Sequence, residues 1–122
     1  MERKIIYLII VLIGMLSSQT LGCATTEIVG GSIPKNLLKD GTYDGIAKEG
    51  PVKVLAEVTI KNQSITKIEL IEHRTWKGRA AENIIPDRII DEQSTSVDAV
   101  SGATISSRVI MNAVEVAIQK AK

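Results

Sequence analysis

The chain has 122 residues, of which 44% are hydrophobic, and its 15 basic and 14 acidic side chains leave a formal net charge of +1. Because Glu2, Arg3 and Lys4 are the only charged residues before Cys23, the chain from that point onward is formally neutral. This balance excludes the strong positive charge that nucleic-acid binding requires. One cysteine and one histidine also exclude an intramolecular disulfide and a zinc-type metal site.

The N-terminus has the pattern of an export signal. After a basic leader, Ile5 to Leu16 is an apolar run of 12 residues, whereas a membrane span needs about 20. A short apolar run followed by small residues is typical of a secretory signal. Gly22-Cys23 resembles the end of a bacterial lipoprotein signal, although Thr20 stands where an aliphatic residue is usual. We therefore expect residues 1–22 to be a signal peptide and Cys23 to be lipidated.

An uncleaved anchor from Ile5 to about Leu21 is the alternative, with Cys23 as a bystander. Either arrangement holds the protein at the extracytoplasmic face of a bacterial cell membrane. Residues 23–39 contain Gly, Ser, Thr and Pro with weak periodicity, which predicts a tether. The folded domain is expected at residues 40–122, and it opens with turn chemistry around a short strand at Asp40–Gly45.

The clearest strand signal follows that opening turn. Apolar residues alternate with mostly polar ones from Val52 to Ile60, which predicts a strand with one solvent-facing side. Asn62-Gln63-Ser64 predicts a turn, and Ile65–Glu72 is expected to form the antiparallel partner.

A polar stretch at residues 73–79 holds the only histidine and the only tryptophan. Its spacing identifies no serine–histidine–acid arrangement, so hydrolysis has no support and no catalytic residue is assigned. Two short helices are then expected, at Ala80–Ile85 and Pro86–Gln93, with Pro86 as a first helical residue. Four isoleucines are expected in the core: Ile84, Ile85, Ile89 and Ile90.

The C-terminal residues predict a helix beginning near Ser101–Ile105, because apolar residues recur there at helical spacing. Thr104 would lie in or beside its first turn, where unpaired amides and the helix dipole favour a phosphate. Gly102 and Ala103 would let a bulky group approach the backbone. On spacing alone, Ser101 could instead cap the helix and Thr104 could be an ordinary first-turn residue. The fold class is α+β, a small antiparallel sheet with short helices and a C-terminal helix packed on it.

The stretch from Asp98 to Ser106 reads DAVSGATIS. It resembles the flavinylation motif of the FMN-binding domain family, D-x-x-S-G-A-T-x-S, and residues 40–45 are similar to the family's opening D-G-T-Y-x-G. The family includes flavin subunits of sodium-pumping quinone reductases and related electron-transport complexes. The resemblance covers roughly residues 40–122 and implies FMN joined through its phosphate to Thr104 by a separate flavin transferase. It also implies an electron carrier between a membrane donor and an unknown acceptor.

The resemblance assigns roles to the neighbouring residues as well. Ser101, Gly102 and Ala103 would shape the backbone near the phosphate, while Asp98 would be read by the transferase or orient the loop. Ser106 would bond phosphate or backbone. Residues 73–79 themselves allow two interpretations, a strand end followed by a solvated loop or a segment that lines the flavin site. In the second, Trp76 would stack on or pack against the isoalloxazine ring, with a nearby cation facing anionic flavin or phosphate: Arg74, Lys77 or Arg79. The alternative function is a lipid-anchored module that binds FMN non-covalently or serves a non-redox binding or regulatory role.

Overall fold

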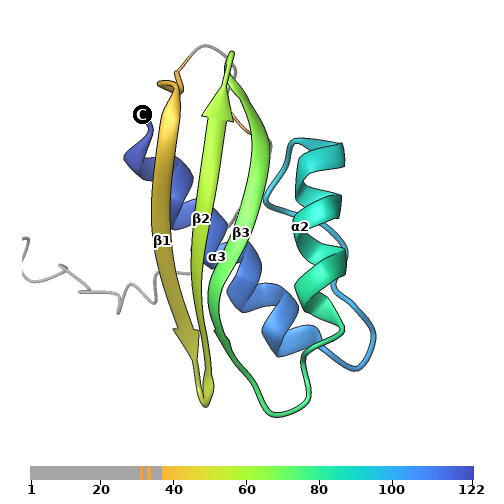
Figure 1. The fold of residues 1–122 in the computed structure, drawn as a ribbon. Coiled ribbons are helices and arrows are strands. Elements are labelled where there is room, and N and C mark those ends of the chain that lie inside the picture. The colour runs from red at the N-terminus through yellow and green to blue at the C-terminus, as the bar shows by residue number, and fades with distance from the viewer. Residues whose placement is uncertain (1–30, 32, 34–36) are drawn as a thin grey trace, which may run out of the picture.

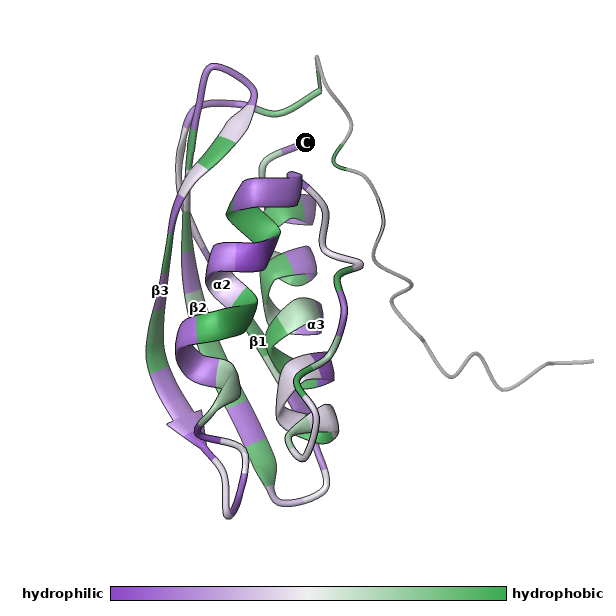
Figure 2. Cartoon of the chain, turned by 90° about the vertical axis from the view of Figure 1, so that its right-hand side faces the viewer, coloured by the Kyte–Doolittle hydropathy of each residue, from purple (hydrophilic) through white to green (hydrophobic). Residues whose placement is uncertain are grey.

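A computed structural model describes residues 31, 33 and 37–122. The elements follow in the order β1 (Gly41–Glu49), β2 (Val52–Lys61), β3 (Ser64–Arg74), α2 (Ala81–Glu92) and α3 (Thr104–Lys120). The strands form one antiparallel sheet in the order β1-β2-β3. Both helices cover the same face of this sheet, α3 behind β1 and β2 and α2 beside β3 (Figures 1 and 2). The predicted α+β class is confirmed.

The central hairpin is the one that alternation predicted. In β2, Val52, Val54, Ala56, Val58 and Ile60 are buried and the residues between them are half-buried. Asn62 and Gln63 connect β2 to β3 with φ values of 50° and 66°. Two consecutive left-handed residues are typical of the tight turn that matches strand twist.

The first strand is longer than its turn-rich sequence predicts. It runs from Gly41 to Glu49 rather than ending at Gly45, and it pairs with β2 along its whole length. A Cβ atom at Gly45 would lie 2.0 Å from the carbonyl oxygen of Ala113 in α3. The strand and the helix therefore touch backbone to backbone at this point, and only glycine leaves room for that contact.

The second helix corrects the expectation of two short helices divided at Pro86. Residues 81–92 form one helix that contains Pro86 as a buried interior residue. Ala81, Ile85 and Ile89 lie one helical turn apart and are fully buried. Their packing outweighs the hydrogen bond that an interior proline removes from a helix.

Three of the four predicted core isoleucines pack inward. Ile85 and Ile89 are fully buried, and Ile90 is partly buried against the core. The prediction for Ile84 is wrong, since that side chain is 38% exposed. It lies one residue before the buried stripe, and a helix rotates by about 100° per residue. Ile84 is therefore rotated away from the face that Ile85 and Ile89 bury.

The N-terminal expectations fall mostly outside the described residues: the signal or anchor at 1–22, Cys23, and nearly all of the segment 23–39. Gly31 and Ile33 are described, and both bond to the loop after α2. The carbonyl of Gly31 accepts from the Thr95 amide at 3.1 Å, and the Ile33 amide donates to the Gln93 carbonyl at 3.2 Å. Within the described part of the chain, no helix has both the length and the apolarity for crossing a membrane.

Candidate functional site

A cavity of about 530 Å³ opens at the N-terminal end of α3. Three segments that are distant in sequence form its walls. They are the turn between β1 and β2 at Pro51 and Val52, the loop at residues 75–78, and the start of α3 at residues 102–106. Its size falls within the range of small-molecule sites, about 300–1,000 Å³.

The start of α3 presents an exposed hydroxyl beside uncapped amides. Thr104 is the first residue of the helix and is exposed. No side chain in the described part of the chain caps this helix, whose N-cap residue is Ala103, and its first turn contains no acidic residue. The Ser101 cap considered above is therefore not formed. An uncapped helix start favours an anion through its free amides and its dipole.

The turn before α3 is held firmly while its backbone stays accessible. The hydroxyl of Ser107 donates to the Ala103 carbonyl at 2.7 Å and accepts the Val100 amide at 3.0 Å. Gly102 has φ of +80°, and a Cβ atom there would meet nothing within 4 Å. The chain thus forms a left-handed turn that leaves open space beside the helix start.

The structure brings together most of the residues that the sequence singled out. The cavity is lined by six of them: Trp76, Lys77, Gly102, Ala103, Thr104 and Ser106. Ser101 and Asp98 are exposed and stand outside the lining. The Asp98 carbonyl accepts a hydrogen bond from Arg88 Nη1 at 2.6 Å, which ties the incoming loop to α2.

The loop at residues 75–78 supplies the aromatic rim of the cavity. Trp76 is 87% exposed, which is unusual for a residue with so much apolar surface to bury. The Lys77 Nζ lies 6.0 Å from the centroid of the Trp76 ring, at the outer limit of a cation–π contact. Three cationic side chains were expected to face the flavin, and only Lys77 of these lines the cavity. Arg74 instead pairs with a carboxylate, its Nη2 lying 3.7 Å from Glu72 Oε1.

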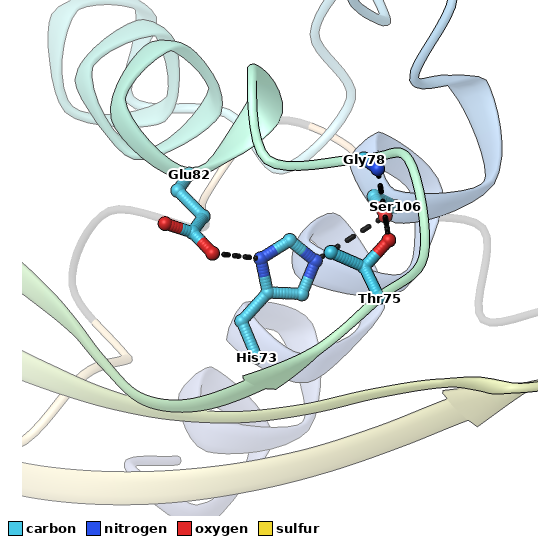
Figure 3. Close-up of polar contacts among 5 residues, drawn as sticks. All are labelled: His73, Thr75, Gly78, Glu82 and Ser106. Carbon is cyan, nitrogen blue, oxygen red and sulfur yellow. Dashed lines mark hydrogen bonds and ion pairs between the residues drawn. The ribbon is translucent and has the colours of Figure 1, made fainter.

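Behind the cavity runs a chain of polar side chains that the sequence did not predict (Figure 3). Glu82 Oε1 lies 2.8 Å from His73 Nδ1, and His73 Nε2 lies 3.2 Å from Ser106 Oγ. Ser106 Oγ is 2.9 Å from Thr75 Oγ1, which also accepts the Gly78 amide at 2.9 Å. These contacts join β3, α2, α3 and the aromatic loop into one network.

The order acid–histidine–serine is the one that hydrolases use to activate a nucleophile. Here the serine is 2% exposed, and its oxygen is shared between His73 and Thr75. Ser106 is therefore one link in a longer hydrogen-bonded chain. Spacing could not reveal it, since Ser106 and His73 are 33 positions apart and meet only when α3 packs on the sheet.

An ion pair outside the cavity lining joins α3 to β1. Arg108, one turn after Thr104, donates to Glu49 through Nε at 2.9 Å and also through Nη2. The hydrogen bond from Arg108 lowers the pKa of Glu49, while partial burial of the carboxylate opposes this shift. The pair joins α3 to the end of β1, next to the turn that lines the cavity.

Residues 48–119 match the model of the FMN-binding domain family. This match spans more than half of the chain, and the chain belongs to that family. It is also 34% identical over 86 residues to an uncharacterized protein of Treponema pallidum (strain Nichols). That similarity covers 68% of this chain and 24% of the relative, so the chain spans about a quarter of the relative's length.

The cofactor of this domain is FMN, and the cavity fits that group. The uncapped helix start and the exposed backbone at Gly102 suit a phosphate. Val52, Ile105 and Trp76 provide apolar surface for a ring. The described residues contain no group of three or more His, Cys, Asp or Glu side chains arranged to hold a metal ion.

Proposed function

We propose that this protein is a membrane-anchored, extracytoplasmic electron carrier whose FMN is esterified through its phosphate to Thr104. The main support is the position of the Thr104 hydroxyl, which is exposed on the cavity wall at the uncapped start of α3. Bound FMN supplies the electron-transfer chemistry, and the protein orients it and limits its contact with solvent.

Attachment requires a separate flavin transferase. The Thr104 oxygen forms a bond to the phosphorus of the flavin donor while the bond from that phosphorus to the donor's leaving group breaks. The threonine proton then passes to a base. Among the described residues that line the cavity, none is a carboxylate or a histidine, and His73 Nε2 is engaged by Ser106. We therefore assign this base to the transferase.

The electron-carrier role is supported by the openness of the site. Trp76 is almost fully exposed at the rim, so one edge of the cavity is accessible to another protein. The partners are a membrane electron donor and an acceptor of unknown identity. Anchoring through Cys23 would keep the domain close to the donor.

The experiment is co-expression of the chain with a flavin transferase, followed by in-gel flavin fluorescence after denaturation. We expect wild-type protein and Thr104→Ser to fluoresce, because both carry a hydroxyl, and Thr104→Ala to be dark but folded. Peptide mapping by mass spectrometry should place FMN on residue 104. Covalent FMN in Thr104→Ala, or on another residue of the wild type, would overturn the assignment. Flavin that is released on denaturation would instead favour the non-covalent binding module.

A further inference from the structure

We propose that His73 is a positioning residue for the cavity, and that its protonation state decides whether the Thr75 hydroxyl donates a hydrogen bond into it. The inference depends on the chain of five residues drawn in Figure 3. Only the identity of the occupant rests on the proposed function.

When His73 is neutral, the donors and acceptors have one consistent assignment. The proton lies on Nδ1 and is donated to the Glu82 carboxylate at 2.8 Å. Nε2 then accepts the hydroxyl hydrogen of Ser106 at 3.2 Å. Because Ser106 has no second hydrogen, the 2.9 Å contact with Thr75 requires Thr75 to be the donor. The hydroxyl of Thr75 is thus turned away from the cavity, while its oxygen accepts the Gly78 amide.

When His73 is protonated, the direction of the hydroxyl bonds reverses. Both ring nitrogens become donors, so Ser106 Oγ must accept from Nε2. The Ser106 hydrogen then turns to Thr75 Oγ1, which already accepts from Gly78. Within this hydrogen-bonded network, no acceptor is then left for the Thr75 hydroxyl hydrogen. Thr75 also lines the cavity. It is free to donate to whatever occupies that space.

The surroundings of His73 leave few other charges to influence it. Its side chain is 3% exposed. Glu82 faces it from α2, Ser106 from α3, and its partner on β2 is the apolar Val54. Glu72 and Arg74 flank His73 along β3, and Lys53 precedes its partner Val54 on β2. Glu72 forms ion pairs with both Lys53 and Arg74. Because side chains alternate along a strand, these three lie on the opposite face of the sheet from His73.

The carboxylate that contacts His73 is itself partly open to solvent, since the Glu82 side chain is 37% exposed. Glu82 also lines a second hollow of about 370 Å³ between β3 and α2, together with Glu69 and Asp87. The histidine therefore lies between an acidic hollow and the cofactor cavity.

Thermodynamic linkage couples the protonation of His73 and the negative charge in the cavity in both directions. A Thr75 donor stabilises negative charge in the cavity, so negative charge in the cavity must stabilise protonated His73 by the same free energy. Reduction adds negative charge to a flavin ring. We therefore expect the protonated fraction of His73 to rise when the bound cofactor is reduced, through the Ser106 and Thr75 hydroxyls.

The first experiment uses the full-length protein without cofactor. His73 is the only histidine, so ¹⁵N-histidine NMR reports on it alone. We expect the neutral ring to carry its proton on Nδ1, and Glu82→Leu to shift it towards Nε2. Hydroxyl hydrogen exchange at Thr75 should accelerate about tenfold on protonation, whereas exchange at Ser106 should stay slow. Thr95, which donates to Glu115 at 2.7 Å and does not contact His73, corrects for intrinsic pH dependence. A neutral Nε2–H ring, or parallel exchange at Thr75 and Thr95, would overturn the proposal.

The second experiment compares oxidised and reduced flavin-loaded protein at fixed pH. The protonated fraction of His73 should rise on reduction in the wild type and in Thr75→Ser. The rise should be lost in Thr75→Val, which keeps the shape but removes the hydroxyl. An equal rise in Thr75→Val would show that charge acts through space, and the hydroxyl relay would be wrong. If no flavin loads, the proposed function fails, while the first experiment still decides the relay.

Discussion

Gly78 and Ser106 are in such close contact that a Cβ atom on Gly78 would lie 1.8 Å from Ser106 Oγ and 2.4 Å from its Cβ. The aromatic loop therefore lies directly on the first turn of α3. The close approach lets Thr75 reach Ser106 and so completes the hydrogen-bonded chain behind the cavity.

Gly78→Ala should separate the loop from the helix. We expect a loss of about 1–3 kcal/mol in the free energy of unfolding, as for other overpacked sites, together with a change in Trp76 emission. Chemical denaturation followed by fluorescence measures both. Ser106→Ala is the matched control, because it removes the hydroxyl but adds no atoms to the contact. A Gly78→Ala variant as stable as the wild type would contradict the described packing.

The Glu49–Arg108 pair should make stability depend on acidity. The pKa of Glu49 is lowered in the folded protein by the Arg108 hydrogen bond. The stabilisation is thus complete above the ordinary glutamate value and is lost as pH falls through the folded value. Both side chains are about half exposed, so Glu49→Gln should cost at most about 1 kcal/mol at neutral pH.

Urea titrations of wild type and Glu49→Gln at pH 7 and at pH 3 test this expectation. The difference between the two proteins should shrink at pH 3 and also in high salt. Glu57→Gln, on the central strand and without a described ion pair, serves as the charge-matched control. A difference that grows on acidification would have the wrong sign.

Trp76 should report directly on the cofactor. Its side chain is 87% exposed and lines the cavity, so we expect its fluorescence to be strongly quenched when FMN is attached. Trp76→Leu should change the stability of the protein without cofactor by no more than about 0.5 kcal/mol, because little surface is buried there. Equal quantum yields with and without flavin would show that Trp76 does not approach the ring.

Cys23 should carry the anchor. Gly22-Cys23 after a short apolar run predicts a lipidated N-terminus. Cys23→Ala should accumulate as unprocessed precursor, and Cys23→Ser is a second variant that keeps the size of the side chain. Mass spectrometry of the membrane fraction distinguishes the forms. A wild-type protein with an intact N-terminus and unmodified cysteine would instead indicate an uncleaved anchor.

The periodicity of hydrophobic residues was sufficient to predict the elements that bury one face and expose the other. Alternation in residues 52–60 predicted β2, and helical spacing placed the start of α3 within one turn of Thr104. Pro86 misled the prediction because its usual position at a helix start is a local preference, whereas Ile85 and Ile89 bury themselves against the sheet. Tertiary packing decided the outcome there.

The candidate site, too, was only partly predictable from the sequence. The contiguous stretch at residues 102–106 was visible as a motif, and it lines the cavity. The chain from Glu82 through His73 to Ser106 was not visible, because its members come from three elements. Such contacts depend on the strand register and on how a helix lies over the sheet, and neither is encoded in residue spacing.

The backbone contact between Gly45 and α3 has a bearing on how loss-of-function variants are interpreted. Ala113 lies nine positions after Thr104 along the helix, or about 13 Å, and there the helix rests on the strand without side chains between them. A single methyl group on the strand would collide with the helix backbone at this point, and we expect the resulting shift of the helix to displace the Thr104 hydroxyl at its start. A genetic screen for flavin-free protein should therefore recover Gly45, although it stands outside the cavity lining.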